Sequence, residues 1–190
     1  MYIDILKRWN ARINLSAIRD EEEIVTRHFG ESLFAARCLF PEPASATEPV
    51  SGRVRLADLG SGAGFPGIPI KLWAPNIHLS LIESNYKKAT FLREVCRALT
   101  LTDVDIQNVR GEELVQTYDI VTLRAVENFA EALQVAVRLV SSMGGLGLLI
   151  GSSQVEIARS TLPAMVWKAP LPVPLSQSRV LLLAEMEPKS

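Results

Sequence analysis

The sequence predicts an α/β protein built on a mostly parallel β-sheet. Beyond residue 53, short apolar runs alternate with helical patterns, and this alternation is typical of βαβ units. A cluster of glycines directly after the first apolar run is the second indication, because ligand-binding turns of open α/β sheets lie at such strand ends. The 190 residues are about enough for one domain, and the 48% hydrophobic content excludes intrinsic disorder.

The first forty residues are expected to be helical. Asp20 is a suitable N-cap, and Glu23 stands at the spacing of a capping box. Three prolines within residues 41–53 predict a linker. We therefore expect a helical N-terminal extension and linker over residues 1–53, followed by one α/β domain over residues 54–190.

The elements of that domain follow from apolar runs and their periodicity. Strands are predicted at residues 54–59, 77–82, 104–106, 118–123, 146–150 and 179–184. Helices are predicted from about residue 85 to 99 and from residue 128 to about 140. Four prolines between residues 163 and 174 break any long helix there, so the last strands are expected to form an antiparallel edge.

Composition and charge exclude several classes of protein. No apolar run approaches the roughly 20 residues of a membrane-spanning helix. No secretory signal follows Met1, and Cys38 and Cys96 lie in helical apolar patterns that do not suggest a disulfide framework. We expect a soluble, cytoplasmic monomer without membrane partner or metal. The net charge is −1, but residues 51–99 carry seven basic and three acidic residues, enough for a local phosphate-binding patch.

The glycine cluster predicts a ligand-binding loop. Four glycines fall within the segment Gly60–Gly67, which follows a predicted strand ending at Leu59. Glycine lets a backbone turn tightly and approach a ligand where a Cβ would collide. A tight turn without a ligand is the alternative, but it would not require four glycines.

The kind of ligand is decided by the acids around this loop. Gly62–Gly67 matches the dinucleotide fingerprint, and Glu83 lies about 20 residues on, where an acid contacts the ribose of NAD. Asp58, however, would repel a diphosphate, and Pro66 removes a backbone donor. S-adenosylmethionine carries a sulfonium, an ammonium group and ribose hydroxyls, which suit Asp58 and Glu83. A dehydrogenase is further disfavoured because Tyr86 is not followed by lysine four residues later.

Several segments resemble the RsmG (GidB) family of bacterial methyltransferases, which methylate guanine N7 in 16S ribosomal RNA. They are NARINLSAI (10–18), HFGES (28–32), DLGSGAGFPGIP (58–69), ESNYKK (83–88) and Arg124-Ala125. The resemblance extends from about Leu6 to the final strand. It implies a Rossmann-like class I methyltransferase with a seven-stranded sheet, helices on both faces and a helical N-terminal extension. It also implies S-adenosylmethionine as cofactor and 16S rRNA, free or in the small ribosomal subunit, as partner.

The resemblance also implies which residues form the site. Gly60, Gly62 and Phe65 would line the cofactor pocket, and Glu83 would bind the ribose. Gly111 and Glu112 would lie beside the adenine. Arg124 would contact cofactor and substrate and act as the catalytic residue.

This sequence departs from the family pattern at three places. Glu31 stands where the family usually has Asp, and Ile150 stands where it usually has Lys before Gly151. The chain also begins late, so most of a first N-terminal helix is expected to be missing.

The remaining candidates have plain structural interpretations. His28 lies on an apolar helical face, where a core or interface histidine is the first expectation. Lys87 and Lys88 suit a solvated helix face as well as RNA phosphates. Arg124 follows a strand end beside the glycine loop, which favours a functional role, although an ion pair with Asp119 or Glu127 would also retain an arginine there.

The absence of an obvious general base agrees with guanine N7 as acceptor. N7 carries an in-plane lone pair and no proton, so proximity, alignment and electrostatics are sufficient. Neither cysteine is placed as the nucleophile that base-carbon methylation needs. The alternatives are a small-molecule methyltransferase on the same fold and a non-catalytic cofactor-binding module.

Overall fold

The sheet confirms the predicted α/β class, but the described residues form eight strands and not the expected seven, because the two-residue strand β7 also pairs with β8. The computed structural model describes residues 1–41, 53–126 and 128–187. Within these residues the strands are β1 (Arg55–Leu59), β2 (His78–Ile82), β3 (Val104–Gln107), β4 (Tyr118–Arg124), β5 (Val140–Gly151), β6 (Met165–Trp167), β7 (Leu171–Pro172) and β8 (Arg179–Met186). Their order is β3-β2-β1-β4-β5-β8-β6, with β7 paired to β8. Neighbours from β3 to β5 are parallel, and β8 is antiparallel to all three of its partners.

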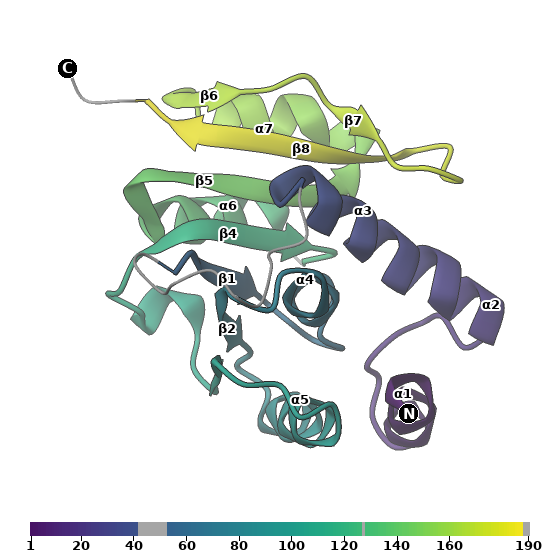
Figure 1. Ribbon diagram of the computed structural model, residues 1–190. Coiled ribbons are helices and arrows are strands. Elements are labelled where there is room, and N and C mark those ends of the chain that lie inside the picture. Colours follow the sequence, from purple (N-terminus) through teal and green to yellow (C-terminus); the bar gives the residue numbers. More distant parts are fainter. Residues whose placement is uncertain (42–52, 127, 188–190) are drawn as a thin grey trace.

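Helices cover both faces of this sheet (Figure 1). The described helices are α1 (Tyr2–Asn10), α2 (Glu21–Glu23), the π-helix η1 (Ile24–Gly30), α3 (Glu31–Leu39), α4 (Gly67–Trp73), α5 (Tyr86–Ala98), the 3-10 turns η2 (Gly111–Glu113) and η3 (Ser152–Gln154), α6 (Phe129–Arg138) and α7 (Val155–Thr161). Helices α1, α4 and α5 pack around one apolar core, whereas α6 and α7 pack on another across the sheet.

Some elements differ from the sequence prediction. Strand β5 begins at Val140, well before the predicted residue 146, because Val140 pairs with Tyr118 of β4. Its pairing with β8 extends from Gly145 to Gly151. Its first residues lack apolar alternation, so the pattern gave no strand there. Strand β6 and helix α7 are too short for a periodicity to emerge. Most of the predicted linker, residues 42–52, lies outside the described residues.

The first forty residues are not helical throughout as predicted, since residues 11–20 form turns between α1 and α2, but the second helical segment begins at Asp20 as expected. The Glu23 backbone N–H donates to Asp20 Oδ1 at 3.0 Å, which confirms the N-cap. The Glu23 carboxylate does not complete a capping box in the described residues and lies 3.7 Å from Arg27 Nη1 instead. From Asp20 the helix continues through the π-helical turns of η1 into α3.

Tyr2 joins the N-terminal helix α1 to the glycine loop. Its hydroxyl donates to the Ala63 carbonyl at 2.6 Å. Its ring stacks on Phe65, with centroids 5.3 Å apart and an interplanar angle of 3°, and meets the edge of Phe29. Since Tyr2, Ala63 and Phe65 are buried in one apolar cluster, the extension and the α/β domain share one core.

We expect Tyr2→Phe to lower the free energy of unfolding by about 1–3 kcal/mol, because the buried Ala63 carbonyl loses its donor. Tyr86→Phe is the matched control, since that side chain is 70% exposed. Urea denaturation followed by circular dichroism measures both. Equal midpoints for the two variants would contradict a structural role of the Tyr2 hydroxyl.

Candidate functional site

The loop after β1 can be built only with glycine at two positions. Gly60 and Gly64 have φ values of +72° and +84°. A Cβ on Gly64 would lie 2.5 Å from Tyr2 Oη and 2.6 Å from Ile68 Cδ1, so both the backbone conformation and the packing exclude a side chain. The Gly60 N–H donates to the Ile82 carbonyl at 2.9 Å, which holds the loop against the end of β2.

Asp58 closes the base of the loop. Its Oδ2 accepts from the Gly67 N–H at 3.2 Å, and its Oδ1 accepts from Thr122 Oγ1 at 2.9 Å. Burial raises the pKa of this carboxyl to about 7, against the lowering effect of those hydrogen bonds. The sequence analysis expected Asp58 to face the ligand. It instead joins β1, β4 and the start of α4, and it borders neither of the cavities described below.

Glu83 holds the loop from the end of β2. Its Oε2 accepts from the Gly62 N–H at 3.0 Å, and its Oε1 accepts from the Asn85 N–H at 2.7 Å. The residue is buried. Each carboxylate oxygen keeps a lone pair beyond these bonds, so the fixed carboxylate is able to accept from a ligand hydroxyl.

A first cavity of about 250 Å³ lies between the ends of β1, β2 and β4 and helix α6. Four predicted site residues meet on its wall: Gly60, Glu83, Gly111 and Glu112. Apolar side chains, among them Ile82 and Val135, form much of the remaining wall. The cavity therefore combines a flat apolar space with two carboxylates.

A second cavity of about 340 Å³ adjoins the first, and Gly60 lines both. The other predicted residues, Gly62, Phe65 and Arg124, lie on its wall. The same wall carries residues that the sequence analysis did not assign to the site: Ser16, Arg27, His28, Lys88 and Arg179. All seven predicted residues thus lie around two neighbouring cavities at the carboxyl edge of the parallel strands.

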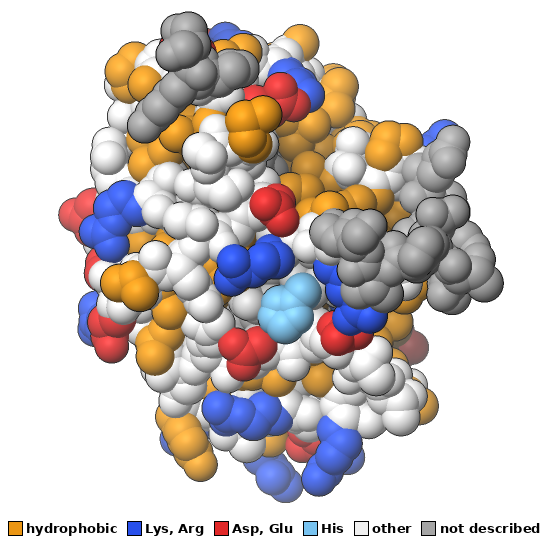
Figure 2. All heavy atoms as spheres, turned by 60° about the vertical axis from the view of Figure 1, so that its left-hand side comes forward, with side chains coloured by type: hydrophobic (Ala, Val, Ile, Leu, Met, Phe, Trp, Pro, Cys, Tyr) orange, Lys and Arg blue, Asp and Glu red, His pale blue; other side chains and the backbone are white. Residues whose placement is uncertain are grey.

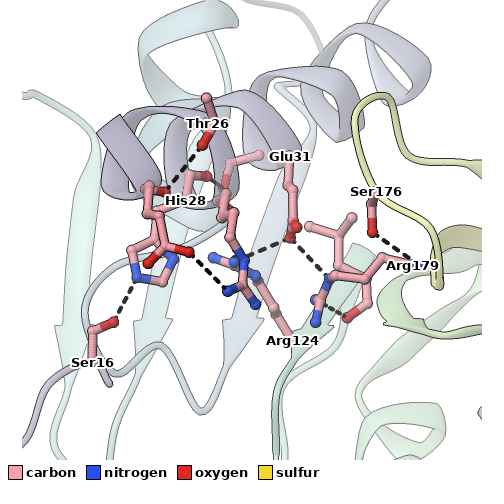
Figure 3. Close-up of polar contacts among 11 residues, drawn as sticks. Ser16, Thr26, His28, Glu31, Arg124, Ser176 and Arg179 are labelled. Carbon is pink, nitrogen blue, oxygen red and sulfur yellow. Dashed lines mark hydrogen bonds and ion pairs between the residues drawn. The ribbon is translucent and has the colours of Figure 1, made fainter. Parts of the chain in front are cut away.

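Arg124, the last residue of β4, is held by the N-terminal extension (Figure 3). Its Nη2 donates to the Arg27 carbonyl at 2.7 Å and to Glu31 Oε2 at 3.1 Å. The same Glu31 oxygen lies 3.0 Å from Arg179 Nε. Burial lowers the pKa of Arg124, and the Glu31 charge opposes this.

Among the described residues the ion-pair partner of Arg124 is Glu31, and not Asp119 as considered from the sequence. Asp119 accepts from the Arg55 N–H at 2.8 Å, at the opposite end of β4, and Glu127 lies outside the described residues. The only feature of the sequence that drew attention to Glu31 was its departure from the family pattern, and this did not indicate a contact with Arg124. Arg179 belongs to no motif, so no pattern in the sequence predicted its position beside the cavity.

His28 and Phe65 form a stacked pair on the second cavity. Their ring centroids are 4.7 Å apart at an angle of 13°, and His28 Nε2 lies 2.7 Å from Ser16 Oγ. Burial and then the charge of Arg124 lower the pKa of His28 to about 3, so its ring is neutral at pH 7. Because Tyr2 covers the other face of Phe65, only the edge of the Phe65 ring is open to a ligand.

The described residues offer neither a metal site nor a membrane-spanning helix. No group of three or more His, Cys, Asp or Glu residues in the described part is placed to hold a metal ion. No described helix is both long and apolar enough to cross a membrane.

Solved methyltransferase structures share this fold. One is M. jannaschii TYW2 in complex with AdoMet, with a TM-score of 0.67 and 14% identity over 94% of this chain and 80% of that chain. Another is ribosomal protein L11 methylase from Lactobacillus delbrueckii subsp. bulgaricus, with a TM-score of 0.65 and 10% identity over 83% of this chain and 78% of that one. These likenesses establish a class I methyltransferase fold with a mixed, mostly parallel sheet.

Sequence comparison identifies the family. A protein named ribosomal RNA small subunit methyltransferase G from Xylella fastidiosa is 40% identical over 177 residues, covering 91% of this chain and 78% of its own length. A protein of the same name from Roseiflexus castenholzii is 42% identical over 135 residues, covering 68% of this chain and 53% of its own length. The family model described as rRNA small subunit methyltransferase G matches residues 1–167, and the chain therefore belongs to the GidB family.

Proposed function

We propose that this protein transfers a methyl group from S-adenosylmethionine to N7 of a guanine in 16S ribosomal RNA. One observation carries the proposal: a carboxylate-lined cavity and an arginine-lined cavity adjoin at Gly60 in a chain of a methyltransferase family. In this proposal residues 54–190 form the domain that holds the cofactor. The extension, residues 1–53, completes the acceptor cavity, and the protein acts as a cytoplasmic monomer.

The first cavity fits the adenosine part of the cofactor. Glu83 is fixed by two backbone donors and keeps lone pairs for the ribose hydroxyls. The apolar wall beside Gly111 and Glu112 suits the adenine. When bound, S-adenosylmethionine supplies an electrophilic methyl group on its sulfonium. Gly60, with no side chain, leaves the passage between the two cavities open.

The second cavity fits the acceptor guanine. N7 needs no general base, and the described lining of the cavity offers no effective one, since burial lowers the pKa of His28 to about 3 and leaves its ring a weak base. Arg124 Nη1 donates to no other residue among those described, whereas Nε is buried without a partner. Nη1 of the fixed guanidinium is therefore the group proposed to donate to guanine O6 and hold N7 in line with the methyl group.

Charge on the surface supports approach of RNA at this edge. Arg27, Lys88, Arg124 and Arg179 gather at the second cavity. The other end of the parallel strands, where they begin, lies on the left-hand side of Figure 1 and comes forward in Figure 2. Basic and acidic side chains are interspersed on that surface. Lys87 and Arg93 on α5, together with Arg12, extend the set of cations proposed to contact phosphates.

Gly60→Val is expected to raise the dissociation constant for S-adenosylmethionine by about tenfold or more, because the positive φ and the passage between cavities tolerate no branched side chain. Gly151→Ala is the control, since its φ of −72° and its open surroundings accept a Cβ. Calorimetry measures both, with circular dichroism confirming the fold. Unchanged affinity in Gly60→Val, or tight NAD binding by the wild type, would refute the cofactor assignment.

Arg124→Ala is expected to lower methyl transfer by about 100-fold or more through loss of positioning. Arg124→Lys should recover little, because a point charge does not replace the planar fork. The assay uses labelled S-adenosylmethionine with small ribosomal subunits from cells lacking this activity, and Arg159→Ala, on the surface of α7, is the control. Near-wild-type turnover with a lowered melting temperature would make Arg124 purely structural.

The same assay tests the two alternatives. A small-molecule methyltransferase would leave the ribosomal subunits unmethylated, and its activity on a metabolite would not depend on salt. A cofactor-binding module would bind S-adenosylmethionine and methylate nothing. Either result in the wild-type protein would replace the proposed function.

A further inference from the structure

One buried carboxylate is shared by two partly buried guanidinium groups beside the second cavity. Glu31 Oε2 lies 3.1 Å from Arg124 Nη2 and 3.0 Å from Arg179 Nε. The three side chains are only 4%, 9% and 22% exposed, respectively. The cluster therefore keeps one positive charge largely out of water.

The surroundings of the cluster do not cancel this charge. His28 stays neutral, and Lys88 adds a further cation to the same wall, as does Arg27, whose Nη1 lies 3.7 Å from Glu23 Oε1. The described residues that line the second cavity include no Asp or Glu. Since a charge shielded from water is costly without a counter-charge, an anion entering this cavity would be stabilised.

Both guanidinium groups are held in place and still have donors to offer. Arg179 Nη2 donates to the Leu149 carbonyl at 3.1 Å, and its backbone N–H donates to Ser176 Oγ at 3.2 Å. Nη1 of Arg179 and Nη1 of Arg124 have no hydrogen-bond partner within residues 1–41, 53–126 and 128–187. Two prepositioned forks with free N–H groups suit the oxygens of a phosphate.

We propose that Arg179 and Arg124 form a phosphate site for the acceptor RNA, with Arg27 and Lys88 on the same wall, where Arg124 Nη1 gives one of its two hydrogens to the phosphate and the other to guanine O6. The proposal rests on the proposed function and adds Arg179, which lies beyond the residues 1–167 matched by the family model. The cofactor is disfavoured as the source of the anion. Its sulfonium, ammonium and carboxylate sum to one positive charge, which this wall repels, whereas RNA is strongly negative.

The decisive experiment compares RNA and cofactor binding in Arg179→Ala and Arg179→Lys. A 16S rRNA fragment that the wild type binds is titrated over a range of salt concentrations. We expect Arg179→Ala to weaken RNA binding by about tenfold and to reduce the salt slope by about one, with Arg179→Lys in between. The dissociation constant for S-adenosylmethionine should stay unchanged. Arg159→Ala removes the same charge from an exposed ion pair on α7 and should behave as wild type.

A second measurement needs neither RNA nor activity. Inorganic phosphate, compared with chloride at equal ionic strength, should raise the melting temperature of the wild type. The rise should be smaller in Arg179→Ala. It should be larger in Glu31→Gln, which removes the carboxylate shared by the two arginines.

Three results would overturn the phosphate site. Weaker cofactor binding with unchanged RNA binding in Arg179→Ala would assign the anion to the methionine carboxylate. A lowered melting temperature without any binding change would make the cluster a structural ion pair. Equal effects of phosphate and chloride in all variants would exclude an anion site. Failure of the proposed function is a separate outcome: the wild type would then methylate no rRNA, whatever Arg179→Ala does to phosphate binding.

Discussion

The buried carboxylate of Asp58 connects the elements on which both cavities depend. It accepts from Thr122 on β4 and from the Gly67 N–H at the start of α4, and it stands at the end of β1. Because these contacts fix both ends of the segment between Asp58 and Gly67, the intervening chain must turn within a very short path. Positive φ angles at Gly60 and Gly64 are the consequence. The two cavities then open on either side of a rigid loop.

The fold was predictable wherever a strand coincided with a short, mostly apolar segment. The segments that became β1, β2 and β4 are mostly apolar with single polar residues between, and the glycines mark where β1 ends. The first part of β5 was not predictable, because its pairing with β4 and β8 depends on backbone hydrogen bonds and not on side-chain pattern. Helix α7 was not predictable either, because it is stabilised by packing against α6 and the sheet.

The candidate site was predictable to the extent that its residues belong to local motifs. Gly60 and Glu83 each follow a strand of the sheet and Arg124 is the last residue of another, so the topology alone brings them to one edge. The contacts of Arg124 with Glu31 and of Glu31 with Arg179 join segments that are far apart in the chain. Periodicity carries no information on such pairings. The role of Asp58 was predicted wrongly for a related reason. An acid at the end of a strand has the same sequence pattern whether its carboxylate faces a ligand or accepts from a backbone N–H.

The second cavity also has a consequence for how the chain acquires its site during synthesis. The first cavity is lined by residues between Leu59 and Val135, so its wall is complete once the middle of the chain has been made. The second needs Ser16 from the N-terminal extension and Arg179 from the last described strand. Contacts of such high sequence separation close late in folding, because a long loop must be ordered first. A nascent chain would therefore assemble the carboxylate-lined cavity before it could enclose the arginine-lined one.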